Sequence, residues 1–188
     1  MTEEKFPCYM MKLVLLGDPA VGKTSLINQY VEHTFENDYK PTLGVNIISK
    51  EINLEEINLK GLRGSAKVVI WDIAGQDKYE FSRKMFFQGC VGALLVYDTT
   101  RNSSFKNIKH KWLQDFKEFG ELNSVFILIA NKIDLNDLKT VPTETGREFA
   151  ESIEACDFIE TSAKDGTNVD EVFKKLIYKI LSDYWKVI

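Results

Sequence analysis

One short stretch constrains the fold of this chain more than any other. Residues 17–24 read Gly-Asp-Pro-Ala-Val-Gly-Lys-Thr and fit the pattern G-x-x-x-x-G-K-[ST]. The apolar run 12–16 before it predicts a buried strand, and residues 25–32 after it predict a helix. A glycine-bearing turn between a strand and a helix directs backbone N–H groups and the positive helix end toward one point. Such a turn wraps a polyphosphate, with the Lys23 ammonium on its oxygens and the Thr24 hydroxyl on Mg²⁺. A chance match on an ordinary loop would lack the flanking strand and helix.

The composition is that of a soluble globular protein and argues against nucleic acid as a partner. The chain has 188 residues, 44% hydrophobic and 28% charged, with a net charge of −4. Its three cysteines fit neither a metal spacing nor a disulfide framework, which favours a reducing compartment. No apolar run approaches the length of a membrane span. We expect a cytoplasmic monomer with one domain over residues 1–188, of which 1–10 form a flexible N-terminal extension.

Short apolar runs alternate with amphipathic segments along the whole chain. This alternation predicts an α/β fold whose mostly parallel sheet carries helices on both faces. A polar hairpin joins two of the strands without a helix, so one antiparallel edge strand is expected. The predicted strands are residues 12–16, 45–54, 66–73, 92–97, 125–130 and 158–160. The predicted helices are residues 23–33, 104–119, 144–153 and 169–185. The lysines and Trp112 of the second helix are expected on a solvated face.

A second motif follows the predicted strand 66–73. Asp72 stands at a strand end beside the phosphate-binding loop, where its carboxylate can hold a Mg²⁺-bound water. Gly75 has no side chain to keep its N–H from a terminal phosphate, and Gln76 can orient an attacking water. An ordinary turn is the alternative for this Asp-x-x-Gly pattern in isolation.

A third motif, Asn131-Lys132-Ile133-Asp134, follows the apolar strand 125–130. The Asp134 carboxylate can accept both N–H groups of the N1/N2 edge of guanine, whereas adenine offers no such pair of donors. The Lys132 stem can lie across the purine face. Further along, a backbone N–H in the run 161–164, that of Ala163, can meet the guanine O6. A strand-ending turn is the alternative for the segment 131–134 alone, and a plain strand-to-helix loop is the alternative for 161–164.

These motifs together resemble the small GTPases of the Ras superfamily, most closely its Rab branch. The stretches that carry the likeness are Trp71-Asp72-Ile73-Ala74-Gly75-Gln76, Phe86-Phe87, Val96-Tyr97-Asp98-Thr99-Thr100, Glu160-Thr161-Ser162-Ala163-Lys164 and Asn168-Val169-Asp170-Glu171-Val172-Phe173. The likeness implies a P-loop small G-protein domain that binds GTP or GDP with Mg²⁺. It also implies two loops, switch I (35–44) and switch II (74–88), that order on the γ-phosphate and release on hydrolysis.

The resemblance assigns a role to each site residue. Gln76, Lys23 and Thr42 would be catalytic, while Thr24, Thr42 and, through water, Asp72 would hold the metal. Phe35 would stack on guanine, and Tyr39 would close over the phosphates. The expected nucleotide contacts are Gly17, Ala20, Val21, Gly22, Lys23, Thr24, Ser25, Phe35, Tyr39, Thr42, Gly75, Asn131, Lys132, Asp134, Ser162, Ala163 and Lys164.

The chain departs from the Rab pattern in four places. The hairpin 54–65 is longer than usual, and Asn46-Ile47-Ile48 replaces part of the usual effector-facing signature. Pro19 has no N–H and lies where an arginine from an activating protein would approach, so an altered response to that protein is expected. No lipidation motif follows residue 188. We therefore expect no direct membrane anchor in this chain, and peripheral membrane binding only through a lipidated tail outside it.

The leading interpretation is a GTP-binding switch with slow GTP hydrolysis. An exchange factor, a GTPase-activating protein and effectors would bind through the two switches. A scaffold that holds nucleotide without cycling is the alternative from another class. A P-loop ATPase or kinase is a third, and Asn131–Asp134 argue against it.

Overall fold

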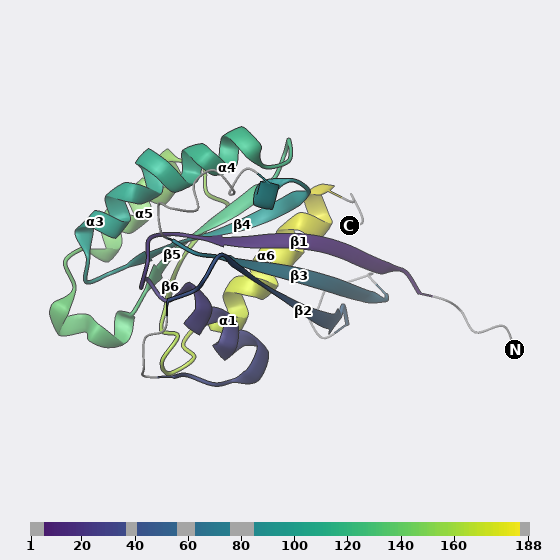
Figure 1. Cartoon of the computed structure of the whole chain (residues 1–188), viewed down its shortest axis with the longest axis horizontal. Coiled ribbons are helices and arrows are strands. Elements are labelled where there is room, and N and C mark those ends of the chain that lie inside the picture. The colour runs from purple at the N-terminus through teal and green to yellow at the C-terminus, as the bar shows by residue number, and fades with distance from the viewer. Residues whose placement is uncertain (1–5, 37–40, 56–62, 76–84, 185–188) are drawn as a thin grey trace, which may run out of the picture.

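The computed structural model describes residues 6–36, 41–55, 63–75 and 85–184, with the backbone alone at Tyr184. Its strands are β1 (Cys8–Leu16), β2 (Val45–Asn53), β3 (Ser65–Ile73), β4 (Cys90–Asp98), β5 (Val125–Asn131) and β6 (Asp157–Thr161). They form one sheet in the order β2-β3-β1-β4-β5-β6 (Figure 1). All neighbours run parallel except β2 and β3. The predicted α/β fold, with six strands and one antiparallel edge strand, is confirmed.

Helices cover both faces of this sheet. They are α1 (Lys23–Glu32), α3 (Asn102–Asn107), the π-helical turn η2 (Ile108–Trp112), α4 (Leu113–Phe119), the 3₁₀ segment η3 (Ile133–Leu138), α5 (Thr143–Ser152) and α6 (Val169–Tyr184). Figure 1 shows α1 and α6 on one side of the sheet, with α3, α4 and α5 on the other. Each side encloses its own hydrophobic cluster. Within the described ranges, no helix is long and apolar enough to cross a bilayer.

The burial of each strand follows from its position in the sheet. Every residue of β4 is buried, because this strand pairs on both edges and has a helix layer on each face. The edge strand β2 instead alternates between exposed and half-buried side chains, as an antiparallel strand with one solvated face does. The central strand and the edge strand therefore differ in burial as their places in the sheet require.

The first strand is longer than the sequence predicts. Cys8 pairs with Ser65 and Met10 pairs with Lys67, so β1 begins four residues before position 12. The prediction of a flexible extension over residues 1–10 is therefore wrong for residues 8–10. Residues 8–10 have exposed or half-buried side chains, because this part of the strand pairs with β3 but lies beyond the start of β4 at Cys90. Residues 1–5 lie outside the described part of the chain.

The connection between β2 and β3 is a hairpin, as expected. Asn53 pairs with Ser65, and the Leu54 N–H donates to the Gly64 carbonyl at 3.1 Å. Leu54 is fully buried and packs in the cluster under α1 and α6. The hairpin's first residue is therefore part of the core, while residues 56–62 lie outside the described ranges.

The predicted single helix over residues 104–119 is wrong in its middle. A π-helical turn separates α3 from α4, and the Leu113 N–H donates to the carbonyl of Ile108, five residues earlier. Trp112, predicted on a solvated face, is fully buried, whereas Lys106 and Lys109 are exposed. Trp112 follows the fully buried Ile108 by four residues and lies on the same inner side of the helix.

The packing of α6 yields a first prediction. Leu176 is fully buried and lies in the cluster between α6 and the sheet. Leu176→Ala should lower the free energy of unfolding by about 2–5 kcal/mol, because it leaves a cavity in a packed core. Urea denaturation measures this change. Lys174→Ala, at an exposed position of the same helix, should change it by less than about 0.5 kcal/mol. Equal effects of the two substitutions would contradict this packing.

Candidate functional site

The glycine-rich turn leaves β1 at Leu16 and enters α1 at Lys23. Gly22 caps the helix with φ +99°, and a Cβ at this position would lie 2.3 Å from Nδ2 of Asn131. Ala20 also has a positive φ, of 62°. The turn therefore depends on a backbone conformation that glycine adopts at low cost, and on close approach of the Asn131 side chain.

Lys23 lies inside this turn. Its ammonium donates to the carbonyl oxygens of Gly17 at 2.7 Å and Asp18 at 3.0 Å. Burial lowers the pKa of Lys23 from 10.5 to about 8, although the Asp72 and Asp18 carboxylates oppose this change. Neutral carbonyl groups thus hold the lysine. An anionic ligand beside it would favour the charged form of its side chain.

The three residues predicted to hold a metal lie together. The Thr24 hydroxyl donates to Oδ2 of Asp72 at 2.5 Å and lies 3.0 Å from the Thr42 hydroxyl. The Thr42 hydroxyl lies 3.5 Å from the same carboxylate oxygen. Burial raises the pKa of Asp72, against the hydrogen bond from Thr24 and the charge of Lys23. Its Oδ1 is buried and has no hydrogen-bond partner in the described part of the chain.

This donor set fits Mg²⁺. Hydroxyl and carboxylate oxygens are the hard ligands that the ion prefers, and it commonly retains several waters. The unpartnered Oδ1 of Asp72 can accept a hydrogen bond from such a water. We expect Thr24 and Thr42 to bind the ion directly.

Asn131, at the end of β5, connects three parts of the site. Its Nδ2 donates to the Val21 carbonyl at 2.9 Å, and its Oδ1 accepts from the Thr161 hydroxyl at 3.0 Å and from the Ala163 N–H at 3.2 Å. The side chain is 1% exposed. The Ala163 N–H, expected on guanine O6, thus has a protein acceptor in this structure, and its contact with guanine remains a prediction.

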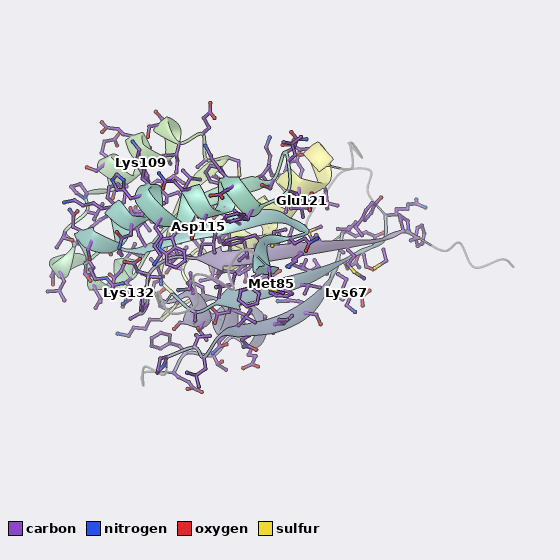
Figure 2. The ribbon with its side chains drawn as sticks, turned by 45° about the horizontal axis from the view of Figure 1, so that its top comes forward. Lys67, Met85, Lys109, Asp115, Glu121 and Lys132 are labelled. Carbon is purple, nitrogen blue, oxygen red and sulfur yellow. The ribbon has the colours of Figure 1, made fainter. Side chains whose placement is uncertain are left out.

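Lys132 and Asp134 follow Asn131 and are each held by another loop. The Lys132 ammonium lies 2.7 Å from Oδ2 of Asp98, at the carboxyl end of the sheet (Figure 2). Burial alone would raise the pKa of Asp98, but hydrogen bonds from Lys132 and Thr100 lower it. Oδ1 of Asp134 accepts from the Ser162 hydroxyl at 2.8 Å. Ser162 therefore orients the carboxylate predicted to read guanine.

A cavity of about 400 Å³ joins the turn to these loops. Of the predicted site residues, it is lined by Ala20, Gly22, Lys23, Thr24, Ser25, Phe35, Thr42, Gly75, Asn131, Lys132, Asp134, Ala163 and Lys164. Gly17, Val21 and Ser162 do not line the cavity but contact residues that do. The Gly17 carbonyl accepts from Lys23, the Val21 carbonyl accepts from Asn131, and the Ser162 hydroxyl donates to Asp134. Tyr39 and Gln76 lie outside the described residues, so their roles stay predictions.

Sequence reasoning missed further residues of this cavity. Pro19, Asn28, Glu36 and Leu135 also line it. Asn28 follows Thr24 by four residues on α1, so helical spacing could have found it. Arg101 gave no sequence signal, yet its Nη2 donates to the Pro19 carbonyl at 2.6 Å from 82 residues away.

Comparison with known proteins agrees with this geometry. The family model of the Ras family matches residues 12–182. The chain belongs to the Ras family. It is 42% identical over 180 residues to Ras-related protein Rab11D of Lotus japonicus, covering 93% of this chain and 77% of that protein. It is 41% identical over 172 residues to Ras-related protein RABA4b of Arabidopsis thaliana, covering 92% and 73%. Ras-related protein RABA1e of the same plant is 38% identical over 177 residues, with 93% and 77% covered.

These relatives confirm the predicted Rab-branch small GTPase. Ile47, in the segment that departs from the Rab pattern, is 52% exposed, and Leu43, near the end of the predicted switch I, is 76% exposed. This Ras-family chain therefore exposes two large apolar side chains within and just after the predicted switch I.

Gly22 provides a second prediction. Gly22→Ala should destabilise the protein more than Gly44→Ala, by about 1–3 kcal/mol, because only the first methyl group meets Asn131. Both glycines have positive φ, and a Cβ at Gly44 would have nothing within 4 Å. The control therefore reports the cost of the backbone conformation alone. Thermal or urea unfolding measures both variants, and indistinguishable losses would contradict the close approach of Asn131.

Proposed function

We propose that this protein is a GTP-binding molecular switch that slowly hydrolyses GTP to GDP and phosphate. The observation that carries this proposal is one cavity lined by both Lys23 and Asp134. The first suits a polyphosphate and the second suits the N1/N2 edge of guanine. Membership of the Ras family supports the same activity.

Guanine selectivity rests on the orientation of Asp134. Ser162 occupies one lone-pair position of its Oδ1 at 2.8 Å, which leaves the remaining carboxylate acceptors for the two guanine donors. Adenine would leave these acceptors unpaired, a mismatch worth roughly 10⁴–10⁵-fold where sites are built in this way. Phe35 and Lys132 would cover the purine from the cavity wall.

Hydrolysis requires charge stabilisation more than covalent chemistry. Lys23 and the N–H groups of the turn would bind the phosphate oxygens, and Thr42 would orient the γ-phosphate. Gln76 would position a water for in-line attack on the γ-phosphorus, with GDP as the leaving group. Bound Mg²⁺ would neutralise charge on the β- and γ-phosphate oxygens. Slow turnover follows when an arginine finger must come from another protein.

The two switch segments contact each other where they leave the sheet. The Ala74 N–H donates to the Gly44 carbonyl at 2.9 Å. A Cβ at Gly75 would lie 2.5 Å from the Pro19 nitrogen, so switch II begins directly against the phosphate-binding turn. A γ-phosphate would thus be sensed by adjoining segments, whose combined surface would recruit effectors in trafficking or signalling. An exchange factor and a GTPase-activating protein would use the same surface.

Nucleotide analysis and a single-turnover assay test this proposal. Protein denatured after purification should release guanine nucleotides, and GTP-loaded protein with Mg²⁺ should release phosphate at a rate on the order of 10⁻⁴ s⁻¹. Gln76→Leu should bind GTP equally well but hydrolyse it more slowly. Bound adenine nucleotides would favour an ATPase or kinase. Guanine nucleotide that stays intact would favour the non-cycling scaffold.

The pKa of Lys23 predicts how GDP affinity depends on pH. Below about pH 8 the ammonium is charged without ligand, whereas above it binding must take up a proton, since phosphate favours the charged form. The association constant should therefore fall by up to about tenfold per pH unit above pH 8. Lys23→Arg stays charged over this range, so it should lose this dependence and retain only that of the nucleotide. Isothermal titration calorimetry measures the GDP affinity of the parent and of Lys23→Arg across this pH range. The same pH dependence in both proteins would contradict the prediction.

A further inference from the structure

The phosphate-binding turn contains an acidic residue, Asp18. A carboxylate among N–H groups that bind an anion repels that anion if it points the same way. Asp18 precedes Pro19 and Ala20, which both line the cavity, yet Asp18 itself does not. Its side chain is therefore held away from the phosphate position.

Two donors from the π-helical region hold this carboxylate. Nδ2 of Asn107 donates to its Oδ2 at 2.8 Å, and Nε1 of Trp112 donates to its Oδ1 at 2.8 Å. Trp112 is fully buried. Each oxygen of Asp18 thus has its own donor, and hydrogen bonds to a charged group are among the stronger ones.

The π-helical turn η2 is what brings these donors together. In an α-helix, residues three or four apart share a face, but residues five apart do not. Asn107 and Trp112 are five apart, and the turn between them has the wider i→i+5 hydrogen bond from Leu113 to Ile108. The wider turn therefore puts these two residues, five apart, on one face of the helix, where both side chains reach the same carboxylate.

A third contact anchors the next residue of the turn. Nη2 of Arg101, directly before α3, donates to the Pro19 carbonyl at 2.6 Å. Residues 18 and 19 are thus both fixed from the helix layer behind the turn.

We propose that Asn107 and Trp112, brought into register by η2, are positioning residues for nucleotide binding that hold the Asp18 carboxylate out of the phosphate site. This inference rests on the proposed function, because it concerns how tightly the same site binds guanine nucleotide. When one of these two donors is lost, the Asp18 carboxylate can turn toward the phosphates, and the affinity for guanine nucleotide falls.

A double-mutant cycle on GDP binding tests this role. Trp112→Phe keeps the aromatic ring but removes the Nε1 donor, and it should weaken GDP binding by about tenfold. In the Asp18→Ala background the same substitution should change GDP affinity by less than about twofold, because no carboxylate remains to be released. Asn107→Ala should likewise weaken GDP binding in the parent protein and change it by less than about twofold in the Asp18→Ala background.

Trp71→Phe is the matched control. Nε1 of Trp71 is buried without a hydrogen-bond partner in the described part of the chain, so its loss should leave GDP affinity within about twofold. Thermal unfolding identifies any variant that fails to fold, and the point substitutions then decide the matter.

The outcomes separate this inference from the proposed function. Unchanged GDP affinity in Trp112→Phe, or equal losses with and without Asp18, would overturn the positioning role while GTP binding by the parent stands. A parent protein that binds no guanine nucleotide would overturn both. The NMR resonance of the Trp112 indole N–H reports its hydrogen bond to Asp18 in the absence of nucleotide. This resonance should shift in Asp18→Ala, and an unchanged resonance would overturn the hydrogen bond itself.

Discussion

The site depends above all on the buried side chain of Asn131. Its amide joins the phosphate-binding turn, through Val21, to the end of β6, through Thr161, and to the segment after it, through Ala163. These segments are far apart in sequence and meet only because β1, β5 and β6 end at the same edge of a parallel sheet. An amide suits this position since it donates and accepts at once, whereas a carboxylate could not donate to Val21. Loss of this group would leave buried backbone groups unpaired on two sides.

The phosphate end of the site is assembled from the protein's own groups. Carbonyl oxygens bind the Lys23 ammonium, and the Thr24 hydroxyl binds the Asp72 carboxylate. These contacts keep the charged groups close to where ligand would need them, so little reorganisation would accompany binding. The same preorganisation accounts for opposite pKa changes: burial lowers that of Lys23 and raises that of Asp72. Both changes favour the neutral form of the side chain. A bound phosphate beside Lys23 and a bound metal ion near Asp72 would reverse them.

Much of this architecture could be predicted from the sequence, because its determinants are local. The turn ending at Thr24 has a fixed spacing, and β4 is a continuous apolar run between helices. The rest depends on contacts that no local pattern encodes. The π-helical turn ends at Trp112, whose side chain binds Asp18, 94 residues earlier in the chain. The early start of β1 depends on pairing with β3, which lies more than fifty residues later.

The antiparallel pairing of β2 with β3 sets the relative position of two residues of the proposed metal site. Val45 lies opposite Ile73, so Thr42 precedes the first rung by three residues and Asp72 lies one residue inside it. A slip of one residue would shift the strands by about 3.4 Å and turn every β2 side chain to the other face. This register is fixed by strand pairing that continues to Asn53 and Ser65, and not by the length of chain between those two residues. The far end of this hairpin, which the sequence predicts to be longer than in Rab proteins, can therefore vary in length without moving Thr42 relative to Asp72.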